Sequence, residues 1–180
     1  MPLLNSVTTP YAEALLQVVT ENDQTEEMVK EVKQLLTLIN DTPELEKTLS
    51  SPVLETETKK KIIIEIFSEK INSSLLNFLK LLADRQRIGI VTSILDRFLE
   101  IYRENSNIAL ATVTSAVELT DEQKGLITKK IINIAGTEKL ELVTKIDPSL
   151  IGGFVASVGS KVIDASLASQ IRKLGLSLSK

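Results

Sequence analysis

The sequence predicts a mainly α protein with a small α/β part: an N-terminal six-helix bundle followed by a small C-terminal α/β domain. Two observations support this fold class. Apolar residues recur at helical spacing through residues 1–105, and short polar turns separate the stretches. After Asn105-Ser106-Asn107 the pattern changes to β-branched runs, alternation and paired glycines. We therefore expect two domains, residues 1–105 and residues 106–180.

Start signals and apolar stripes predict the first three helices. Thr9 followed by Pro10 is typical of a helix start, because a proline at the first position loses no hydrogen bond. Asp23 with Glu26 resembles a capping box for the second helix. Pro43, preceded by a threonine, opens a short third helix.

Three more helices follow by the same reasoning. The fourth runs roughly from Glu55 to Phe67, and Asn72 can cap the fifth. Apolar residues surround more than half of the fifth helix, so neighbours should cover it on two sides. The sixth has an apolar stripe made of Val91, Ile94, Leu95, Phe98, Ile101 and Tyr102. Short loops between helices of this kind predict a bundle.

The C-terminal region begins with a strand and a helix. Residues 108–117 are rich in β-branched and small residues and lack a helical period, which favours a strand. Thr120 and Gln123 form a capping box for the next helix, and Gly136 ends it. Residues 140–146 then alternate as a strand does.

A hairpin and a last helix complete the C-terminal region. Residues 154–158 and 161–164 are strands joined by the two-residue turn Gly159-Ser160. Ser166 can cap the last helix, and we expect the apolar face of that helix to pack on the sheet. This face consists of Leu167, Ile171, Leu174 and Leu178.

Composition excludes several kinds of chemistry. The chain has no cysteine and no histidine, which removes thiol nucleophiles, the usual zinc ligands and Ser-His-Asp sites. Aromatic residues make up only 3%, so a surface that stacks nucleic-acid bases is not expected. The net charge is −5 over residues 1–105 and +2 over residues 106–180, and neither value implies a polyanionic partner.

Membrane insertion is also not expected. The apolar runs are all shorter than the roughly 18–20 residues that span a bilayer. The first basic residue is Lys30, so the N-terminus resembles neither a signal peptide nor an arginine-rich transit peptide. Any attachment to a membrane should therefore go through a partner.

The glycine-rich segment 152–161 superficially resembles a phosphate-binding loop. The spacing is wrong, and Lys161 follows the serine instead of preceding it. Asp147 and Asp164 lie near these glycines and leave a carboxylate-only enzyme as an alternative. Turn and cap roles suit both residues better, because one precedes a proline and the other precedes Ser166 by two positions. We expect no cofactor, metal ion or small-molecule substrate.

The first and fifth helices carry more apolar residues than one core contact needs. Both helices could simply be central in the bundle. The functional interpretation is a groove that receives an amphipathic partner helix. The residues of this predicted groove are Tyr11, Ala14, Leu15, Val18, Phe78, Leu81 and Leu82.

Four segments carry a resemblance to a known family. PYAEAL at 10–15 and NFLKLLADRQRI at 77–88 resemble the first and fifth helices of ATP synthase delta subunits, relatives of the mitochondrial oligomycin-sensitivity-conferring protein. IDPSLIGG at 146–153 and VGSKVIDASL at 158–167 resemble the family signature. The signature residues are Gly152, Gly153, Gly159, Asp164 and Ser166. The resemblance covers essentially the whole chain.

The resemblance implies a fold and a role. The fold is a six-helix N-terminal domain with a smaller C-terminal α/β domain. The role is that of a non-catalytic stator subunit, which links the alpha/beta catalytic head to the peripheral stalk so that proton flow drives ATP synthesis. The groove would take the N-terminal helix of an alpha subunit, and the C-terminal domain would hold the b-type stalk subunits. A helical peptide-binding adaptor of another complex is the alternative.

Two further sequence details bear on the resemblance: a short segment that indicates the branch of the family, and three positions that depart from the family pattern. LSSPVL at 49–54 is closer to the cyanobacterial and plastid branch, which implies a peripheral location on the cytoplasmic or stromal face of an energy-transducing membrane, the thylakoid. Ser157 stands where relatives have a basic residue, and Ala168-Ser169 stand where they often have Arg-Gly. These departures bear on charge-based contacts there, not on the family.

We predict a protease-sensitive boundary near residues 105–108, where the pattern changes and asparagine and serine form a loop-like cluster. Limited digestion followed by mass spectrometry should leave a stable fragment of about 105 residues. Early cleavage within residues 75–82 would contradict the two-domain interpretation.

Overall fold

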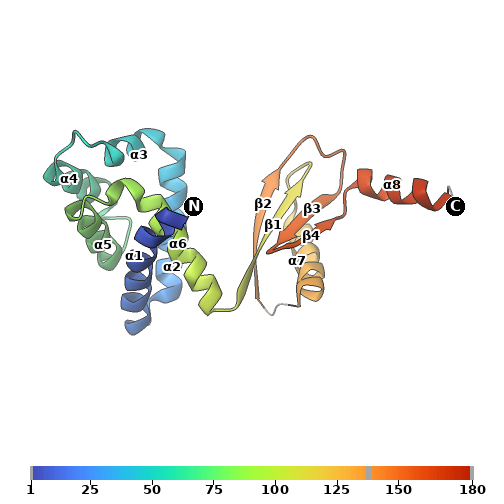
Figure 1. Ribbon diagram of the computed structural model, residues 1–180, viewed down its shortest axis with the longest axis horizontal. Coiled ribbons are helices and arrows are strands. Elements are labelled where there is room, and N and C mark those ends of the chain that lie inside the picture. The colour runs from blue at the N-terminus through green and yellow to red at the C-terminus, as the bar shows by residue number, and fades with distance from the viewer. Residues whose placement is uncertain (1, 137–138, 179–180) are drawn as a thin grey trace. The chain divides into compact units, whose positions relative to one another are not determined.

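The computed structural model describes residues 2–136 and 139–178, and it has the predicted class: mainly helical with a small C-terminal mixed sheet (Figure 1). The helices that precede the first strand are α1 (Pro2–Glu21), α2 (Thr25–Asp41), α3 (Pro43–Ser50), α4 (Thr56–Phe67), α5 (Ser73–Asp84) and α6 (Val91–Asn105), with a 3-10 turn η1 (Ile88–Ile90). The elements that follow are β1 (Ile108–Ser115), α7 (Asp121–Ala135), β2 (Lys139–Ile146), β3 (Phe154–Val158), β4 (Lys161–Asp164) and α8 (Leu167–Leu178).

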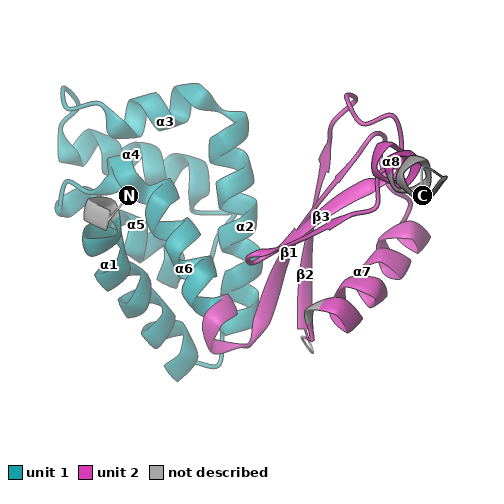
Figure 2. Cartoon of the chain, turned by 45° about the vertical axis from the view of Figure 1, so that its right-hand side comes forward, with its two compact units in different colours: residues 1–102 teal, residues 103–180 magenta. Residues whose placement is uncertain are grey.

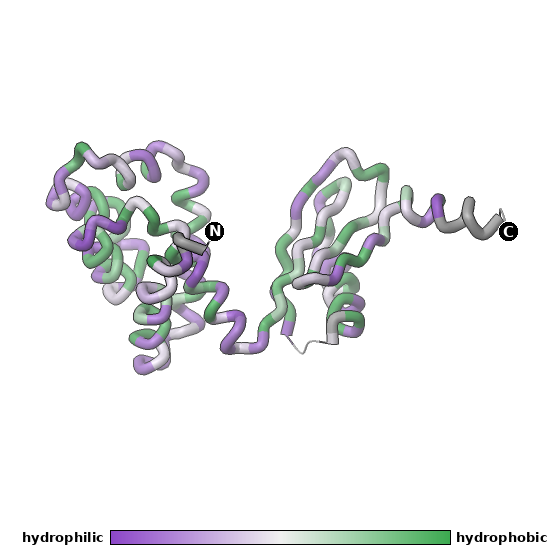
Figure 3. Tube along the Cα trace, viewed as in Figure 1, coloured by the Kyte–Doolittle hydropathy of each residue, from purple (hydrophilic) through white to green (hydrophobic). Residues whose placement is uncertain are grey.

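The chain divides into two compact units, Met1–Tyr102 and Arg103–Lys180 (Figure 2). Each unit has its own cluster of buried apolar residues. Figure 3 shows apolar and polar residues alternating along the helices of the first unit, as amphipathic helices around a shared interior require. Each unit is therefore held together by its own hydrophobic core.

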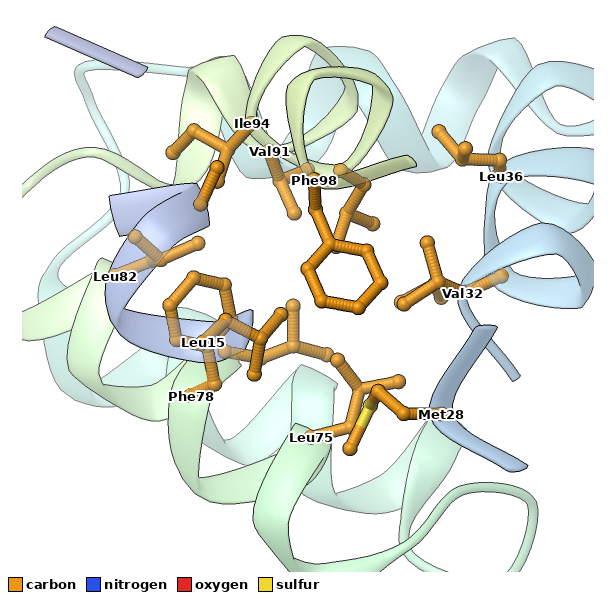
Figure 4. Packing of buried hydrophobic residues seen from close by; sticks show 14 of the residues in the cluster. Leu15, Met28, Val32, Leu36, Leu75, Phe78, Leu82, Val91, Ile94 and Phe98 are labelled. Carbon is orange, nitrogen blue, oxygen red and sulfur yellow. The ribbon is translucent and has the colours of Figure 1, made fainter. Parts of the chain in front are cut away.

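The first unit is organised around aliphatic side chains and three phenylalanines, Phe67, Phe78 and Phe98. Phe98 and Ile94 of α6 are fully buried, as are Val32 of α2 and Leu75 of α5. Figure 4 shows these side chains converging from several helices on one interior. Burying each such side chain contributes about 1.5–3 kcal/mol relative to leaving it in water.

The second unit is a four-stranded sheet in the order β2-β1-β3-β4, with α7 packed on it (Figure 1). Strand β1 pairs parallel with β2, and β3 pairs antiparallel with both β1 and β4. Ile127 and Ile131 of α7 are buried in the same cluster as Ala111, Val113 and Ala156 of the sheet. The small side chains at the centre of the sheet leave room for the larger ones of the helix.

The prediction that Thr9 and Pro10 start the first helix is wrong. Helix α1 begins at Pro2 and contains Pro10 in its interior, where proline costs a backbone hydrogen bond. Tertiary contacts hold this turn: Thr8 is buried, and the Thr9 hydroxyl accepts a hydrogen bond from Arg97 Nε at 3.3 Å. A local start signal was therefore overridden by contacts with residues far along the chain.

The predicted capping box of the second helix is also wrong. Asp23 has a φ of 55°, and it lies in the turn between α1 and α2. Gln24 is the residue before α2, and its side chain makes no capping hydrogen bond. Asp23 thus serves a left-handed turn, which aspartate tolerates better than most residues.

Other predicted caps are confirmed. The Asn72 carboxamide oxygen accepts a hydrogen bond from the Ser74 N–H at 2.9 Å at the start of α5. Thr120 and Gln123 form both bonds of the capping box that starts α7. Gly136 ends α7 with a φ of 73°, the left-handed conformation that glycine adopts without steric cost.

The prediction that the apolar face of the last helix packs on the sheet is wrong for the residues that can be checked. Leu167 is 45% exposed and Ile171 is 65% exposed. The side chains of Leu174 and Leu178 lie outside those that the structure describes. Helix α8 extends away from the end of the sheet (Figure 1), which agrees with the exposure of Leu167 and Ile171.

Asn72→Ala should destabilise the first unit by about 1 kcal/mol, because the first turn of α5 loses the acceptor for the Ser74 N–H. The backbone N–H of residue 72 also donates to Glu31 Oε2 at 2.9 Å and would still do so in the variant. Urea unfolding measures the effect. Asn72→Ser, which retains a capping oxygen, should stay close to the parent; equal losses in both variants would contradict the cap.

Candidate partner-binding sites

The predicted groove divides into a buried floor and an exposed rim. Leu15 of α1 and both Phe78 and Leu82 of α5 are buried, and all three belong to the core of the first unit. Figure 4 shows these three side chains next to one another. The floor therefore has a structural role whether or not a partner binds above it.

The remaining groove residues reach the surface of the first unit. Val18 is 47% exposed, Leu81 is 44% exposed, Ala14 is exposed and Tyr11 is half-buried against the core. A single exposed apolar residue is ordinary on a protein surface. Here the exposed residues come from the same helices as the buried floor, which is the composition that an amphipathic partner helix needs.

The signature glycines of the second unit allow two backbone segments to approach closely. Gly153 has a φ of 79°, and a Cβ there would overlap the Ala165 carbonyl oxygen and lie 2.9 Å from Ser166 Cα. A Cβ on Gly152 would lie 2.7 Å from Leu167 Cδ1. Contact with backbone cannot be relieved by rotating a side chain, so the requirement for glycine is stricter at position 153.

Two backbone hydrogen bonds connect the same segments. The Ala165 N–H donates to the Phe154 carbonyl at 2.9 Å, and the Leu167 N–H donates to the Gly152 carbonyl at 3.0 Å. The start of β3 is therefore bonded to the residues that lead into α8.

The polar signature residues cap α8. Asp164 Oδ1 accepts from the Ser166 N–H at 2.9 Å, and the Ser166 hydroxyl accepts from the Ser169 N–H at 3.2 Å. Ser166 is buried, as a side chain that supplies a hydrogen bond inside the fold should be. The cap predicted at Ser166 is confirmed.

Gly159 has a separate role in the hairpin turn. Its φ is 56°, and an added Cβ would have no neighbour within 4 Å. The positive φ favours glycine at position 159, although a side chain there would meet no steric clash.

Asp147 forms a local turn, as expected for a residue before proline. Its Oδ1 accepts from the Ser149 N–H at 2.9 Å, and its own N–H donates to the Ser115 carbonyl at 2.8 Å. Hydrogen bonds from the side chain and backbone of Ser149 lower the pKa of the Asp147 carboxyl below its ordinary value. Asp147 and Asp164 thus each serve a turn or cap of their own. Across residues 2–136 and 139–178, no three carboxylates gather as a metal site would need.

Sequence reasoning missed an apolar cavity in the second unit. The cavity has a volume of about 480 Å³ and is lined mainly by apolar side chains of the β1–α7 connection, α7 and the segment before β3. Ile151, at its edge, is 81% exposed, and Val117 and Leu126 are also exposed. Only an isoleucine next to the paired glycines, in a loop where apolar residues are unusual, signals this surface in the sequence.

Comparisons with known proteins match these features to one family. The family described as "ATP synthase delta (OSCP) subunit" matches residues 7–178. ATP synthase subunit delta of Prochlorococcus marinus subsp. pastoris (strain CCMP1986 / NIES-2087 / MED4) is 97% identical over 100% of both chains. The same subunit of strain MIT 9303 is 56% identical over 100% of this chain and 99% of that one.

A solved structure has a similar fold. A chain of the Toxoplasma gondii mitochondrial ATP synthase hexamer superimposes with a TM-score of 0.71, covering 96% of this chain and 97% of that chain. The two sequences are 18% identical, so this likeness concerns the fold alone.

The turn at Asp147 makes a testable prediction about pH. The folded-state pKa of the Asp147 carboxyl is lower than its ordinary value of 3.8. The carboxylate therefore stabilises the fold fully at pH values above 3.8, and this stabilisation is lost as the pH falls through the folded-state pKa. NMR titration should give a midpoint below 3.8. Ser149→Ala should raise that midpoint, whereas Ser160→Ala should leave it unchanged. A parent midpoint at or above 3.8 would contradict the assignment.

Proposed function

Since the chain belongs to the ATP synthase delta (OSCP) subunit family and is thus a non-catalytic stator subunit of F-type ATP synthase, we propose how its two units divide that work. The N-terminal unit, with α1 to α6 acting as one bundle, binds the N-terminal helix of an alpha subunit of the catalytic head. The C-terminal unit holds the b-type subunits of the peripheral stalk. The observation that carries this division is that each compact unit has its own core and its own exposed apolar surface.

The surface of α1 and α5 supports the head-side assignment. Ala14 of α1 offers a small exposed side chain where a partner helix can approach closely, and Val18 of α1 and Leu81 of α5 add exposed apolar side chains. Covering the exposed parts of Val18 and Leu81 would remove apolar area from water, which favours association by about 25 cal/mol per Å². A helix with residues at i, i+3, i+4 and i+7 on one face suits such a surface.

The apolar cavity and its rim support the stalk-side assignment. Ile151, Val117 and Leu126 expose apolar side chains around the cavity, and the exposed face of α8 adds Leu167 and Ile171 from the same unit. A contact that holds against rotor torque should be broad, and a stable interface typically buries about 800 Å² on each partner. Several dispersed apolar residues fit that requirement better than one charge pair.

The proposed mechanism is mechanical. Rotation of the rotor exerts torque on the catalytic head, and the stalk resists it only while a continuous connection runs from head to stalk. The chain supplies that connection and needs no reactive side chain to do so. Because the chain belongs to this family, it is not an adaptor of an unrelated complex.

We place the chain peripherally on the cytoplasmic or stromal face of an energy-transducing membrane, the thylakoid. As an ATP synthase delta subunit it is peripherally membrane-associated. In the part of the chain that the structure describes, no helix has the length and apolar character needed to cross a bilayer. The Prochlorococcus source of the similar subunits supports the thylakoid assignment.

Ala14→Asp should weaken binding of a peptide from the alpha subunit's N-terminus by several kcal/mol, on the order of 100-fold or more in Kd. The reason is that an unpaired carboxylate would face the apolar side of the incoming helix. Ala14→Ser is the matched control, because it stays small and uncharged and should bind nearly as the parent does. Isothermal titration calorimetry measures both. Equal binding by the folded aspartate variant and the parent would show that the site lies elsewhere.

Deleting residues 107–180 should leave binding to the catalytic head within about threefold of the parent and weaken stalk binding by roughly 100-fold or more. ATP hydrolysis by the head should persist, while proton-driven synthesis in reconstituted vesicles should fail. Normal synthesis with the truncated chain would refute the stalk-side assignment.

A further inference from the structure

The signature residues of the second unit meet where the sheet ends and α8 begins. We infer that four of them are positioning residues, which fix the direction in which α8 leaves the sheet so that the stalk meets α8 in one orientation. These four residues, called the junction below, are Gly152, Gly153, Asp164 and Ser166. The inference rests on the proposed function, since it concerns how the stalk-side unit presents its surface.

Backbone bonds first connect the two segments in a defined register. Phe154, at the start of β3, accepts from Ala165, and Gly152 accepts from Leu167, the first residue of α8. Two bonds separated along both segments restrain rotation as well as distance. The first turn of α8 is therefore attached to the sheet through main-chain atoms.

Gly153 makes this attachment possible. With a φ of 79°, it brings its own backbone against Ala165 and Ser166 so closely that any Cβ would overlap them. A larger residue would have to move the segment that leads into α8. The direction of α8 thus depends on the lack of a side chain at Gly153, which lies in the segment before β3.

The polar pair determines where the helix starts. Asp164 accepts from the N–H of Ser166, the residue before α8, and the Ser166 hydroxyl accepts from the Ser169 N–H, which is one of the free N–H groups in the first turn of α8. Moving the helix start by one residue would break both bonds. The cap therefore determines the rotational position of the apolar face of α8.

Packing on the sheet does not supply the same restraint for the described part of α8. Leu167 and Ile171 remain largely exposed. Residues 167–178 contain Arg172 and Lys173 and no acidic residue, so α8 offers a basic and apolar helix to a partner. A link that transmits force needs its contact surface held in one direction, and the junction is the feature that does so here.

A distance measurement tests the inference in the full-length chain. The sequence contains no cysteine, so spin labels can be attached to Lys129→Cys in α7 and Arg172→Cys in α8 without other changes. Pulsed electron paramagnetic resonance then gives the distribution of α7–α8 distances. Binding to the soluble portions of the b-type subunits and to the catalytic head is measured on unlabelled chains.

Paired variants separate positioning from general stability. Gly153→Ala and Gly159→Ala both place a side chain at positive φ, but only the first meets backbone. Asp164→Ala removes the acceptor for Ser166, and Asp164→Asn retains an oxygen there. Val113→Ala opens the buried core of the second unit and lowers its melting temperature without touching the junction.

Gly153→Ala and Asp164→Ala should broaden the distance distribution and weaken stalk binding at least about tenfold, with head binding unchanged. Gly159→Ala, Asp164→Asn and, below its melting temperature, Val113→Ala should resemble the parent in both measurements. A narrow distribution in Gly153→Ala would overturn the inference, and so would parent-like stalk binding despite a broad one. Equal losses in Val113→Ala would overturn it too, by showing a stability effect.

Stalk binding by the parent chain distinguishes failure of the stalk-side assignment from failure of the inference about the junction. If the parent chain does not bind the stalk portions, the stalk-side assignment fails and the inference fails with it. If the parent binds and the junction variants bind equally well, only the inference fails.

Discussion

The close approach of two backbone segments at Gly153 is the constraint on which the C-terminal unit depends. It joins the start of β3 to the residues before α8, and the hydrogen bonds on either side hold only because no side chain stands between them. The hairpin returns the chain to Asp164 at the right place for the cap at Ser166. A family signature that resembles a phosphate-binding loop is therefore explained by geometry, without any ligand.

Both units combine a hydrophobic core with exposed apolar side chains, although the cores differ in size and composition. The first buries a large aliphatic interior among its helices and leaves apolar side chains of α1 and α5 on its surface. The second has a small core between α7 and the sheet, and its exposed apolar residues lie around a cavity and along α8. Neither unit needs a side chain that titrates near neutral pH for its task, and the chain has no histidine or cysteine to provide one. A connector between two larger assemblies fits these properties.

Local signals made some elements predictable. The caps at Asn72 and Thr120 and the helix end at Gly136 use partners within four residues, so the sequence shows donor and acceptor together. Strand positions followed from β-branched composition in the first strand, from alternation in the second and from the hairpin turn at Gly159 in the last two. These features need no knowledge of how distant segments meet.

Long-range contacts set the limits of prediction. Helix α1 continues through Pro10, and the contact that ties this turn down comes from Arg97. The prediction that the apolar face of α8 packs on the sheet failed because an amphipathic pattern indicates that a face is covered but does not indicate which segment covers it. The cavity beside Ile151 arises where residues 115–127 meet residues 151–154, and no single stretch of sequence contains it.

The central claim is that one continuous chain connects the catalytic head to the stalk, and cutting that chain after assembly tests it most directly. A recognition site for a specific protease, inserted between Ser106 and Asn107, allows cleavage in vesicles that already contain the assembled complex. Cleavage should abolish proton-driven ATP synthesis while ATP hydrolysis by the head continues. Undiminished synthesis after complete cleavage would contradict the claim.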